Sequence, residues 1–200
     1  MTDTLIDFIR HGEPEGGRLY RGNRIDDPLS ETGWRQMWES VGSNAPWQTI
    51  VTSPMARCHS FATALAGRHG LPVSIQNDFR EIGLGRWEGK TPEQVADEMP
   101  DQYSAFYADP AAHPPPGSEP VPAFGQRVAA ALARVVSEFA QQHLLVIAHA
   151  GVIRAALGTA LSAPPSAWYR TRVDYASLTR LRQTRFGLKL EFHNRVTGDW

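Results

Sequence analysis

Short apolar runs alternate with longer segments of mixed character along the chain. The apolar runs predict strands at residues 4–10, 49–52, 73–76, 144–148, 177–181 and 188–193. The longer segments predict helices at residues 30–41, 54–65, 92–108, 124–140 and 151–161, the third of them as one or two short helices. Because helices alternate with buried strands, we expect an α/β fold: a three-layer α/β/α sandwich around a mostly parallel sheet.

Capping and turn residues support several of these elements. Ser30 is a good N-cap for the first helix, Pro54 suits the first turn of the second, and Gly70 suits its C-terminal end. The connecting segments are polar and rich in Gly or Pro, and residues 78–122 contain the most Pro-rich stretch. That stretch completes no separate core on either side. We therefore interpret 78–122 as a loop-rich cover over the site and residues 1–200 as a single domain.

Composition narrows the function more than the fold. The chain has 200 residues, 42% of them hydrophobic and 20% charged, which is enough for a packed core. Its net charge of −1 disfavours a nucleic-acid binder that acts through an overall positive field. A single cysteine, Cys58, cannot form an internal disulfide, and no stretch approaches the ~20 apolar residues of a membrane span. We therefore expect a cytoplasmic protein with no membrane or nucleic-acid partner.

Two histidines directly follow predicted strands. Arg10-His11-Gly12 comes after the first strand, and His149 comes after the strand at 144–148, just before a helix. Ligands of α/β sheets bind beyond the carboxyl ends of the strands, and the N-terminus of the helix after His149 favours an anion. A second Arg-His-Gly, at residues 68–70, ends a predicted helix, where glycine serves as a cap. A single strand-end histidine is usually structural, but two in one domain favour a ligand site.

Taken alone, Arg57 is interpreted as a surface helix arginine and Glu81 as one charge in a loop. Both, however, belong to a set of six ordered segments that spans nearly the whole chain. These segments are residues 10–13, 27–30 with Gly33, 53–54 with Arg57, Glu81 with 85–89, 116–119 with Phe124 and 127–128, and 149–154. Together they resemble the histidine phosphatase superfamily, which includes the cofactor-dependent phosphoglycerate mutases. The resemblance implies a phosphoglycerate mutase-like α/β fold.

The resemblance also implies a metal-independent phosphomonoesterase and gives each site residue a role. His11 would attack phosphorus and become phosphohistidine, with a carbonyl on its other ring nitrogen to fix the tautomer. Arg10, Arg57 and His149 would neutralise the phosphoryl oxygens, so that neither a metal nor a cofactor is required. Glu81 would protonate the leaving oxygen and then deprotonate water. The expected substrate-binding residues are Gly12, which would let the backbone approach a ligand, and Arg21, Gly22 and Ala150.

The chain departs from the mutases shortly after the first motif. Pro14 and Gly17 stand where the mutases usually have a hydroxyl residue and an Asn. Arg21 would either replace the lost phosphate contacts or be an ordinary loop arginine, and both alternatives stay open. Residues 13–22 and 33–37 are similar to the α-ribazole-5′-phosphate phosphatases of cobalamin synthesis. The expected substrate is therefore a small phosphorylated metabolite, with α-ribazole 5′-phosphate as the specific candidate.

Other functions remain compatible with the sequence. A phosphoglycerate mutase would release little free phosphate, and a non-catalytic binder of a phosphorylated ligand would show no turnover. A metal-dependent hydrolase built on His11, Glu81 and His149 is disfavoured, because the neighbouring arginines would repel a metal cation. Either a monomer or a homodimer fits the sequence.

Several aromatic side chains either form walls of the pocket or pack in the core. They are Trp87, Tyr103, Phe106, Tyr107 and Trp168.

Overall fold

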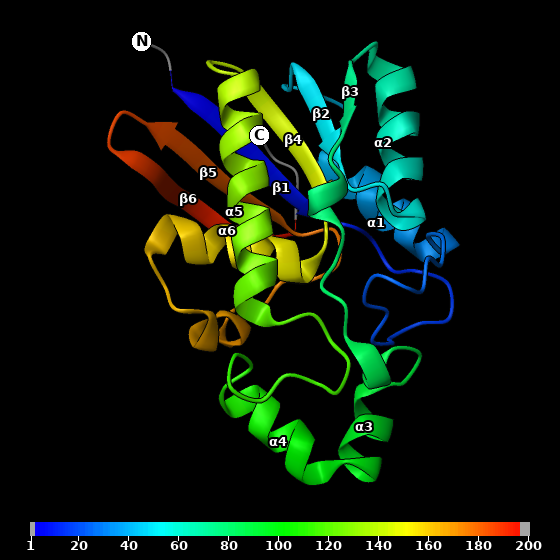
Figure 1. The fold of residues 1–200 in the computed structure, drawn as a ribbon. Helices are drawn as coiled ribbons and strands as arrows, with labels where there is room; N and C mark the ends of the chain where they lie inside the picture. Colours follow the sequence, from blue (N-terminus) through cyan, green and yellow to red (C-terminus); the bar gives the residue numbers. More distant parts are fainter. Residues whose placement is uncertain (1–2, 197–200) are drawn as a thin grey trace.

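The computed structural model describes residues 3–196, and its centre is one six-stranded sheet (Figure 1). The strands are β1 (Thr4–Arg10), β2 (Thr49–Thr52), β3 (Val73–Ile75), β4 (His143–Ala148), β5 (Leu178–Thr184) and β6 (Gly187–Arg195). Their order in the sheet is β3-β2-β4-β1-β5-β6. The strands β1 to β4 run parallel, and β5 and β6 complete the sheet as antiparallel strands. All six predicted strands are therefore present.

Helices cover both faces of the sheet. The helices α1 (Glu31–Val41) and α2 (Ala56–His69) pack on one face, and α5 (Val121–Glu138) and α6 (Ala150–Leu161) pack on the other. The short helices α3 (Pro92–Glu98) and α4 (Pro100–Ala108) lie below the sheet in Figure 1, beyond the carboxyl ends of the parallel strands. The predicted three-layer α/β/α sandwich is confirmed. No helix within residues 3–196 is both long and apolar enough to cross a membrane.

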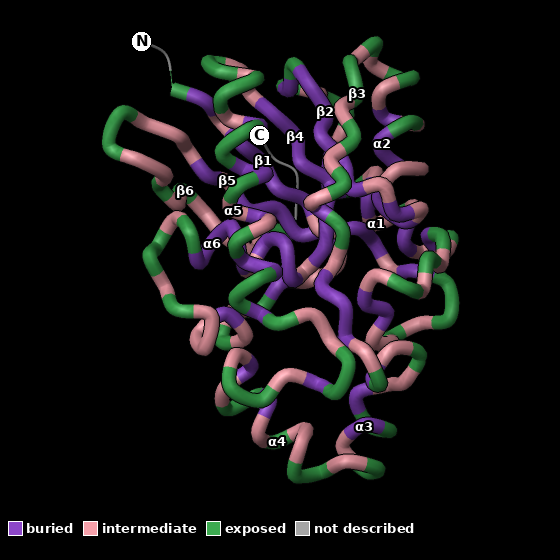
Figure 2. The backbone as a smooth tube through the Cα atoms, viewed as in Figure 1, coloured by how far each residue is buried: buried purple, intermediate pink, exposed green. Residues whose placement is uncertain are grey.

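The alternation of side chains along β1 and β4 divides the core into two parts. Phe8 and Val146 pack against α5 and α6, whereas Ile9 and Ile147 pack against α1 and α2. All four side chains are fully buried, and Figure 2 shows the central strands as a largely buried part of the chain. A strand covered on both faces needs apolar residues at successive positions, which explains why the central strands form continuous apolar runs.

The register of β1 and β4 sets the position of the site. Arg10 pairs with Ala148, so the last residues of the two parallel strands lie level with each other. His11 and His149 are the next residues after these strands, and their ring centroids are 5.2 Å apart. Two residues separated by most of the sequence therefore meet at the carboxyl edge of the sheet, where the sequence predicted a ligand site.

Several boundaries differ from the prediction for local reasons. The second helix begins at Ala56 rather than at Pro54, and the Asp26 carboxylate accepts the Ala56 N–H at 2.7 Å from across a loop. No local pattern reveals a cap supplied from so far away in sequence. The helix α5 begins one turn earlier than predicted, with Pro122 in its first turn. Residues 165–170 form a 3-10 helix that the pattern did not predict.

The segment 78–122 has more secondary structure than the predicted loop-rich cover. It overlaps the 3-10 turn Asn77–Phe79 and includes a second one, Gly85–Trp87, besides α3 and α4. The helix α3 begins with a capping box, in which the Thr91 side chain accepts the Gln94 N–H and the Gln94 side chain accepts the Thr91 N–H. The segment is thus held by its own short elements.

A buried charge network lies in the centre of the sheet. The Asp7 carboxylate on β1 is fully buried and accepts hydrogen bonds from Arg180 Nε at 2.6 Å and from Trp47 Nε1 at 2.8 Å. His143 Nε2 lies 2.6 Å from the same carboxylate. Burial alone would raise the pKa of Asp7, but the hydrogen bonds from His143 and Arg180 outweigh burial and lower it. Arg180 on β5 donates a second hydrogen bond to this carboxylate, from Nη2 at 3.0 Å.

Candidate active site

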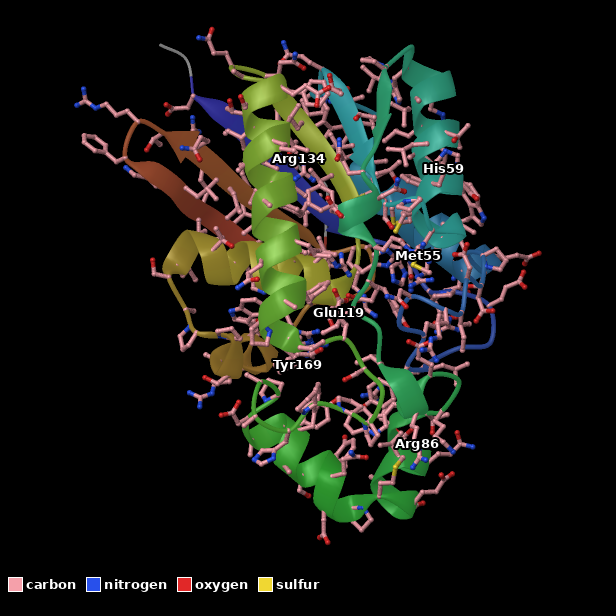
Figure 3. The ribbon with its side chains drawn as sticks, in the orientation of Figure 1. Met55, His59, Arg86, Glu119, Arg134 and Tyr169 are labelled. Carbon is pink, nitrogen blue, oxygen red and sulfur yellow. The ribbon has the colours of Figure 1, made fainter. Side chains whose placement is uncertain are left out.

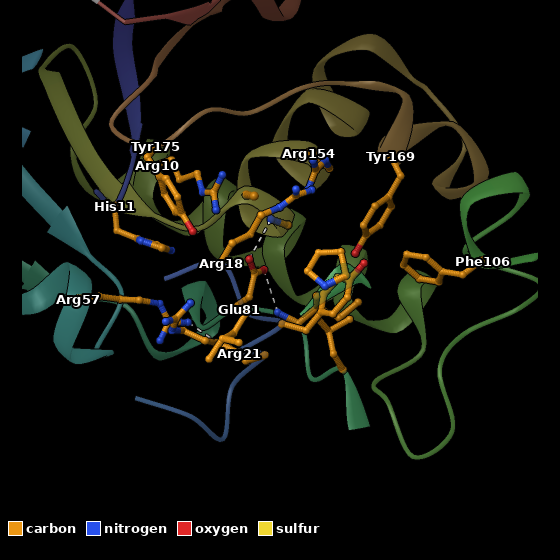
Figure 4. Close-up of a pocket in the computed structure, with 18 of the residues that line it drawn as sticks. Arg10, His11, Arg18, Arg21, Arg57, Glu81, Phe106, Arg154, Tyr169 and Tyr175 are labelled. Carbon is orange, nitrogen blue, oxygen red and sulfur yellow. Dashed lines mark hydrogen bonds between the residues drawn. The ribbon is translucent and has the colours of Figure 1, made fainter. Parts of the chain in front are cut away.

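The carboxyl edge of the sheet contains a cavity of about 200 Å³, which brings together distant parts of the chain (Figure 4). Arg10 ends β1 and His11 follows it, Arg57 lies in the first turn of α2, and Glu81 lies between the two 3-10 turns. All four side chains line the cavity. His149 is not among the lining residues but is buried directly beside His11. The five residues to which the sequence assigned catalytic roles are therefore assembled at one place.

His11 is held as a neutral imidazole with one nitrogen available. Its side chain is 5% exposed, and its Nδ1 lies 2.8 Å from the carbonyl oxygen of Gly12. A carbonyl only accepts, so Nδ1 carries the proton and Nε2 keeps its lone pair. Burial lowers the pKa of His11 well below 6.5, and the positive charges of Arg57 and Arg10 lower it further. The ring is therefore neutral at pH 7, as a nucleophile must be.

Arg10 and Arg57 are each anchored by carbonyl groups, and each has a buried Nε without a partner among the described residues. Arg10 Nη1 donates to Val173 O at 2.7 Å. Arg57 Nη1 and Nη2 donate to the carbonyls of Ile25 at 3.0 Å and Gly22 at 3.1 Å. The Nε atoms of both arginines are buried and have no hydrogen-bond partner among the described residues. A buried donor without a partner is costly, so the two side chains are preorganised for an anionic ligand.

His149 is fully buried at the N-cap position of α6. Its Nε2 lies 2.8 Å from Ser53 Oγ and 3.7 Å from Cys58 Sγ. Burial lowers the pKa of His149 well below 6.5, with further contributions from Arg57 and His11, so this ring is neutral as well. Burial also raises the pKa of the Cys58 thiol, so this side chain is a protonated packing group rather than a nucleophile.

The Glu81 carboxylate is bound at the N-terminus of α6. Its Oε2 accepts the N–H of Gly151 at 3.1 Å, and its Oε1 accepts the N–H of Ile82 at 2.9 Å. A Cβ atom on residue 151 would lie 2.2 Å from Glu81 Oε1, so only glycine allows this approach. The sequence predicted that this helix N-terminus faces an anion beside His149. In the absence of a ligand, one of its N–H groups holds the site's own acid.

Three of the predicted binding residues, Gly12, Gly22 and Ala150, differ in whether they face the cavity. The close approach that Gly12 permits is to α1, because a Cβ at residue 12 would lie 2.3 Å from Gly33 O. Gly22 adopts a φ of +56° and lines the cavity, and its carbonyl anchors Arg57. Ala150 lines the cavity at the first residue of α6. Gly22 and Ala150 thus face the cavity, whereas Gly12 is a glycine for packing.

Arg21 is not a solvated loop arginine, because its side chain is only 5% exposed and lines the cavity. Its Nε donates to Asp27 Oδ2 at 2.8 Å and its Nη1 donates to Gly17 O at 2.8 Å. Its Nη2 donates to the carbonyl of Glu15. The guanidinium therefore holds together the loop in which Pro14 and Gly17 replace the mutase residues. Because the side chain also lines the cavity, it contributes positive charge there.

The far side of the cavity is aromatic, and half of its aromatic residues were not predicted. Figure 4 shows Tyr169 and Phe106 across Glu81 from His11, and Tyr107 and Tyr20 line the same side with their hydroxyl oxygens 2.7 Å apart. The sequence offered Phe106 and Tyr107 as candidates and missed Tyr20 and Tyr169, which adjoin no strand end. The remaining candidates, Trp87, Tyr103 and Trp168, pack in or against the core.

A further arginine on this side was also missed. Arg154 lies on α6 at the position three residues after Gly151, where helix geometry directs a side chain back toward the helix N-terminus. Its Nε donates to Thr171 O at 3.1 Å, and its guanidinium carbon lies 4.8 Å from the centre of the Tyr169 ring. No carboxylate within residues 3–196 forms an ion pair with it. The i, i+3 spacing from Gly151, within the segment 149–154 that carries the family resemblance, was a sequence signal that could have found it.

The cavity is strongly cationic although the protein is nearly neutral. Among the described residues that line it, Glu81 is the one carboxylate, and the arginines are Arg10, Arg18, Arg21, Arg57 and Arg154. Within residues 3–196, no group of three or more His, Cys, Asp or Glu side chains is placed to hold a metal ion. The arrangement can bind a phosphoryl group beside a neutral, unprotonated imidazole nitrogen, with a carboxylate on the side away from that nitrogen.

Comparison with known proteins places this geometry in a family context. A sequence model described as histidine phosphatase superfamily (branch 1) matches residues 6–196. The adenosylcobalamin/alpha-ribazole phosphatase of Escherichia coli (strain K12) is 30% identical over 172 residues, which are 84% of each chain. A solved structure of mycobacterial glucosyl-3-phosphoglycerate phosphatase Rv2419c is 26% identical and superimposes with a TM-score of 0.84, covering 96% of this chain and 99% of that one.

A third relative is longer than this chain. The bifunctional protein Rv2228c of Mycobacterium tuberculosis (strain ATCC 25618 / H37Rv) is 30% identical over 182 residues, which are 89% of this chain and 50% of that protein. The chain therefore spans about half the length of some of the curated relatives that it matches.

Proposed function

Because the chain belongs to the histidine phosphatase superfamily (branch 1), we propose that it is a metal-independent phosphomonoesterase that acts through a phosphohistidine on His11. One observation carries the proposal: a neutral His11 with its Nε2 lone pair free stands beside two arginines whose buried Nε atoms lack partners among the described residues. A phosphoryl group between them would receive positive charge on its oxygens and a nucleophile at phosphorus. Phosphoryl transfer needs chiefly this positioning and neutralisation.

In the first step His11 Nε2 attacks phosphorus and the bond to the ester oxygen breaks. Nδ1 keeps its proton and its hydrogen bond to Gly12 O, so the ring keeps its orientation as it becomes positively charged. An in-line displacement places the leaving oxygen opposite Nε2, on the side of Glu81. Protonated Glu81 gives its proton to that oxygen, and the products are the alcohol and phospho-His11. His149 is assigned the role of a neutral donor to the phosphoryl group.

In the second step water replaces the alcohol. The Glu81 carboxylate takes one proton of the water as its oxygen attacks phosphorus, and the bond from phosphorus to Nε2 breaks. The products are inorganic phosphate, neutral His11 and protonated Glu81, so the site returns to its starting state. Arg10 and Arg57 neutralise the phosphoryl oxygens in both steps, which is the contribution that a metal ion makes in other phosphatases.

The test is to trap the intermediate. A phosphomonoester is mixed with the protein, the reaction is quenched under alkaline conditions, and mass analysis locates the phosphate, which should lie on His11. The His11→Ala variant should lose phosphate release by at least about 10³-fold. His69→Ala, in the other Arg-His-Gly, is the matched control and should keep full activity. Unimpaired turnover by His11→Ala would end the proposal.

The same assays separate the alternatives. Stoichiometric release of inorganic phosphate contradicts a mutase, which would return isomerised phosphoester instead. Unchanged rates in the presence of a chelator contradict a metal-dependent hydrolase. Absence of turnover on a broad panel of phosphomonoesters would favour a non-catalytic binder of phosphorylated ligands.

The sequence resemblance makes α-ribazole 5′-phosphate, in cytoplasmic cobalamin synthesis, the first specific substrate to assay. A relative 30% identical is named for that phosphatase activity, and the aromatic wall formed by Tyr20, Phe106, Tyr107 and Tyr169 suits an aromatic leaving group. A higher kcat/KM for α-ribazole 5′-phosphate than for alkyl phosphates of similar size supports this assignment. Equal values would leave only the general phosphatase reaction.

A phosphorylated hydroxy acid is the second candidate, and Arg154 favours it. Within residues 3–196 its Nη atoms have no carboxylate partner, and Arg154 lines the side of the cavity to which the leaving group would extend. The matched substrates are 3-phosphoglycerate and glycerol 3-phosphate, which differ in one carboxylate. Under this candidate Arg154→Gln should lower kcat/KM for 3-phosphoglycerate about 10- to 100-fold and change that for glycerol 3-phosphate much less. Arg185→Gln, at the β5–β6 turn, is the control.

A further inference from the structure

One of the six ordered segments contains Glu119 and Arg127. These two residues have no part in the reaction described above. Arg127 lies in the second turn of α5 and binds the backbone of the segment that leads to Glu81. Its Nη1 donates to Asp78 O at 2.6 Å and to Arg80 O at 3.0 Å, and its Nη2 donates to Glu81 O at 3.2 Å. A single guanidinium thus holds three carbonyls, including that of the proposed acid.

Glu119 binds Arg127 and also the backbone on the other side of Glu81. Its two carboxylate oxygens accept Arg127 Nε at 2.7 Å and Nη2 at 2.9 Å, a bidentate pair in which each side chain is about one-fifth exposed. The N–H of Glu119 donates to Gly83 O at 2.9 Å, and Glu119 Oε2 lies 3.4 Å from the N–H of Gly83. In Figure 3, Glu119 lies beside α5. The backbone is therefore held on both sides of Glu81.

The same helix also touches the group that binds the Glu81 carboxylate. Phe124 lies one turn before Arg127 on α5, and the Arg127 guanidinium is 4.6 Å from the centre of its ring. The edge of the Phe124 ring lies 3.3 Å from the position of a Cβ on Gly151, whose N–H binds the carboxylate. The backbone of Glu81 is thus fixed by α5, and its carboxylate is fixed by α6 where α6 meets α5.

We propose that Arg127 and Glu119 are positioning residues, which hold the Glu81 carboxylate at hydrogen-bond distance from the leaving oxygen. This inference rests on the proposed function, because it concerns the proton transfer of the first step. The segment around Glu81 is not part of the sheet and lies between two 3-10 turns, so the sheet does not fix it. A general acid acts only within about 3 Å of its target, and a displacement of about 1 Å costs on the order of 10²-fold in rate.

The experiment compares two substrates with different needs for the acid. Glycerol 3-phosphate would release an alkoxide, which must be protonated, whereas p-nitrophenyl phosphate releases a phenolate that leaves without a proton. The ratio kcat/KM reports the steps up to loss of the alcohol or phenolate, so slow water attack does not affect it. We expect Arg127→Gln to lower kcat/KM for glycerol 3-phosphate about 100-fold and for p-nitrophenyl phosphate less than about 5-fold.

The matched control is Arg134→Gln. Arg134 lies on the same helix, two turns further along, and its Nη2 forms an exposed ion pair with the side chain of Asp78, without binding a carbonyl of the segment. Exposed pairs contribute little, so both substrates should be hydrolysed at the wild-type rate. Arg127→Lys, which keeps the charge but loses the planar fork, should recover only part of the activity on glycerol 3-phosphate.

Glu119→Gln provides a second variant if Arg127→Gln is insoluble. It keeps the shape of the side chain and weakens one side of the bidentate pair, so it should show the same substrate selectivity with a smaller loss. Equal losses on both substrates, or no loss on either, would overturn the positioning role. Failure of the proposed function is distinguishable, because then the wild-type protein itself would form no phospho-His11.

Discussion

Gly151→Ala changes the site by one methyl group and tests whether the position of the Glu81 carboxylate matters for the reaction. The new Cβ would lie 2.2 Å from Glu81 Oε1 and 3.3 Å from the Phe124 ring. Carbon and oxygen atoms in contact are normally separated by about 3.4 Å or more, so the carboxylate must retreat by about 1 Å. The helix α6 itself cannot move away easily, because Val152 and Ile153, the next residues, are fully buried in the core.

The expected effect on activity is large and the expected effect on stability is small. A displacement of about 1 Å at a general acid costs on the order of 10²-fold in kcat/KM, or about 2.7 kcal/mol of transition-state stabilisation. Gly151 has an ordinary helical conformation, since its φ is not positive, and Ala is favoured over Gly in a helix by about 1 kcal/mol. This gain offsets part of the steric cost, so the melting temperature should change by only a few degrees.

The assay is kcat/KM on glycerol 3-phosphate together with thermal unfolding. The control is Gly67→Ala in α2, where a Cβ would meet no atom within 4 Å, so stability should rise slightly and activity should stay unchanged. Full activity in Gly151→Ala would refute the reasoning, because it would mean that the carboxylate can be displaced without consequence. A collapse of the melting temperature would equally contradict it, since it would place the role of Gly151 in packing rather than in the site.

Three further predictions concern buried ionisable groups. Asp7→Asn should lower the free energy of unfolding by about 3–5 kcal/mol in urea titrations at pH 7, because it removes the buried carboxylate to which Arg180 donates two hydrogen bonds; equal stability would contradict this. In the unchanged protein the Asp7 contribution is fully present above the ordinary Asp pKa of about 3.9 and is lost as pH falls through its lowered pKa. The His11 ring, followed by NMR, should titrate well below about pH 6.5, because burial lowers its pKa; a midpoint at or above that value would contradict the neutral nucleophile. Cys58 should react with an aromatic disulfide reagent only after unfolding, because its buried thiol has a raised pKa; fast reaction of the native protein would show that the site opens.

The fold was largely predictable because it follows from local patterns that repeat along the chain. Apolar runs identify strands, and the caps were predicted correctly: the Ser30 side chain accepts the Gly33 N–H, and Gly70 ends α2 in the left-handed conformation. The start of α2 was wrong because its cap, Asp26, comes from a different loop. Elements whose ends are fixed by neighbours in sequence are thus visible in the pattern, and those fixed by distant residues are not.

The site residues beside His11 were predictable for a similar reason, whereas Tyr20 and Tyr169 on the far side of the cavity were not. Arg10, His11 and His149 follow strand ends, and the order of parallel strands brings strand ends together whatever the details of packing. Tyr20 reaches the cavity from a loop and Tyr169 from a short 3-10 helix, and the course of both segments depends on contacts that no periodicity encodes. Under the proposed function, the residues that would contact the leaving group therefore lie where sequence patterns carry the least information.

The role of each arginine in this chain depends on the groups that it binds, and composition does not reveal those groups. All but two of the 20 basic residues are arginines, which a count alone cannot divide into structural and ligand-binding groups. Arg127 uses all three of its nitrogens on Glu119 and on carbonyls, so it holds protein and has little left for a ligand. Arg180 likewise forms an ion pair with the buried carboxylate of Asp7. Arg10 and Arg57 differ because carbonyls hold Nη1 of Arg10 and both Nη atoms of Arg57, while each Nε is buried without a partner among the described residues. A carbonyl orients a cation without neutralising it, and the carboxylate of Asp26, which lies 3.7 Å from Arg57 Nη1, is half exposed. These two arginines therefore keep their geometry and much of their charge for an anion.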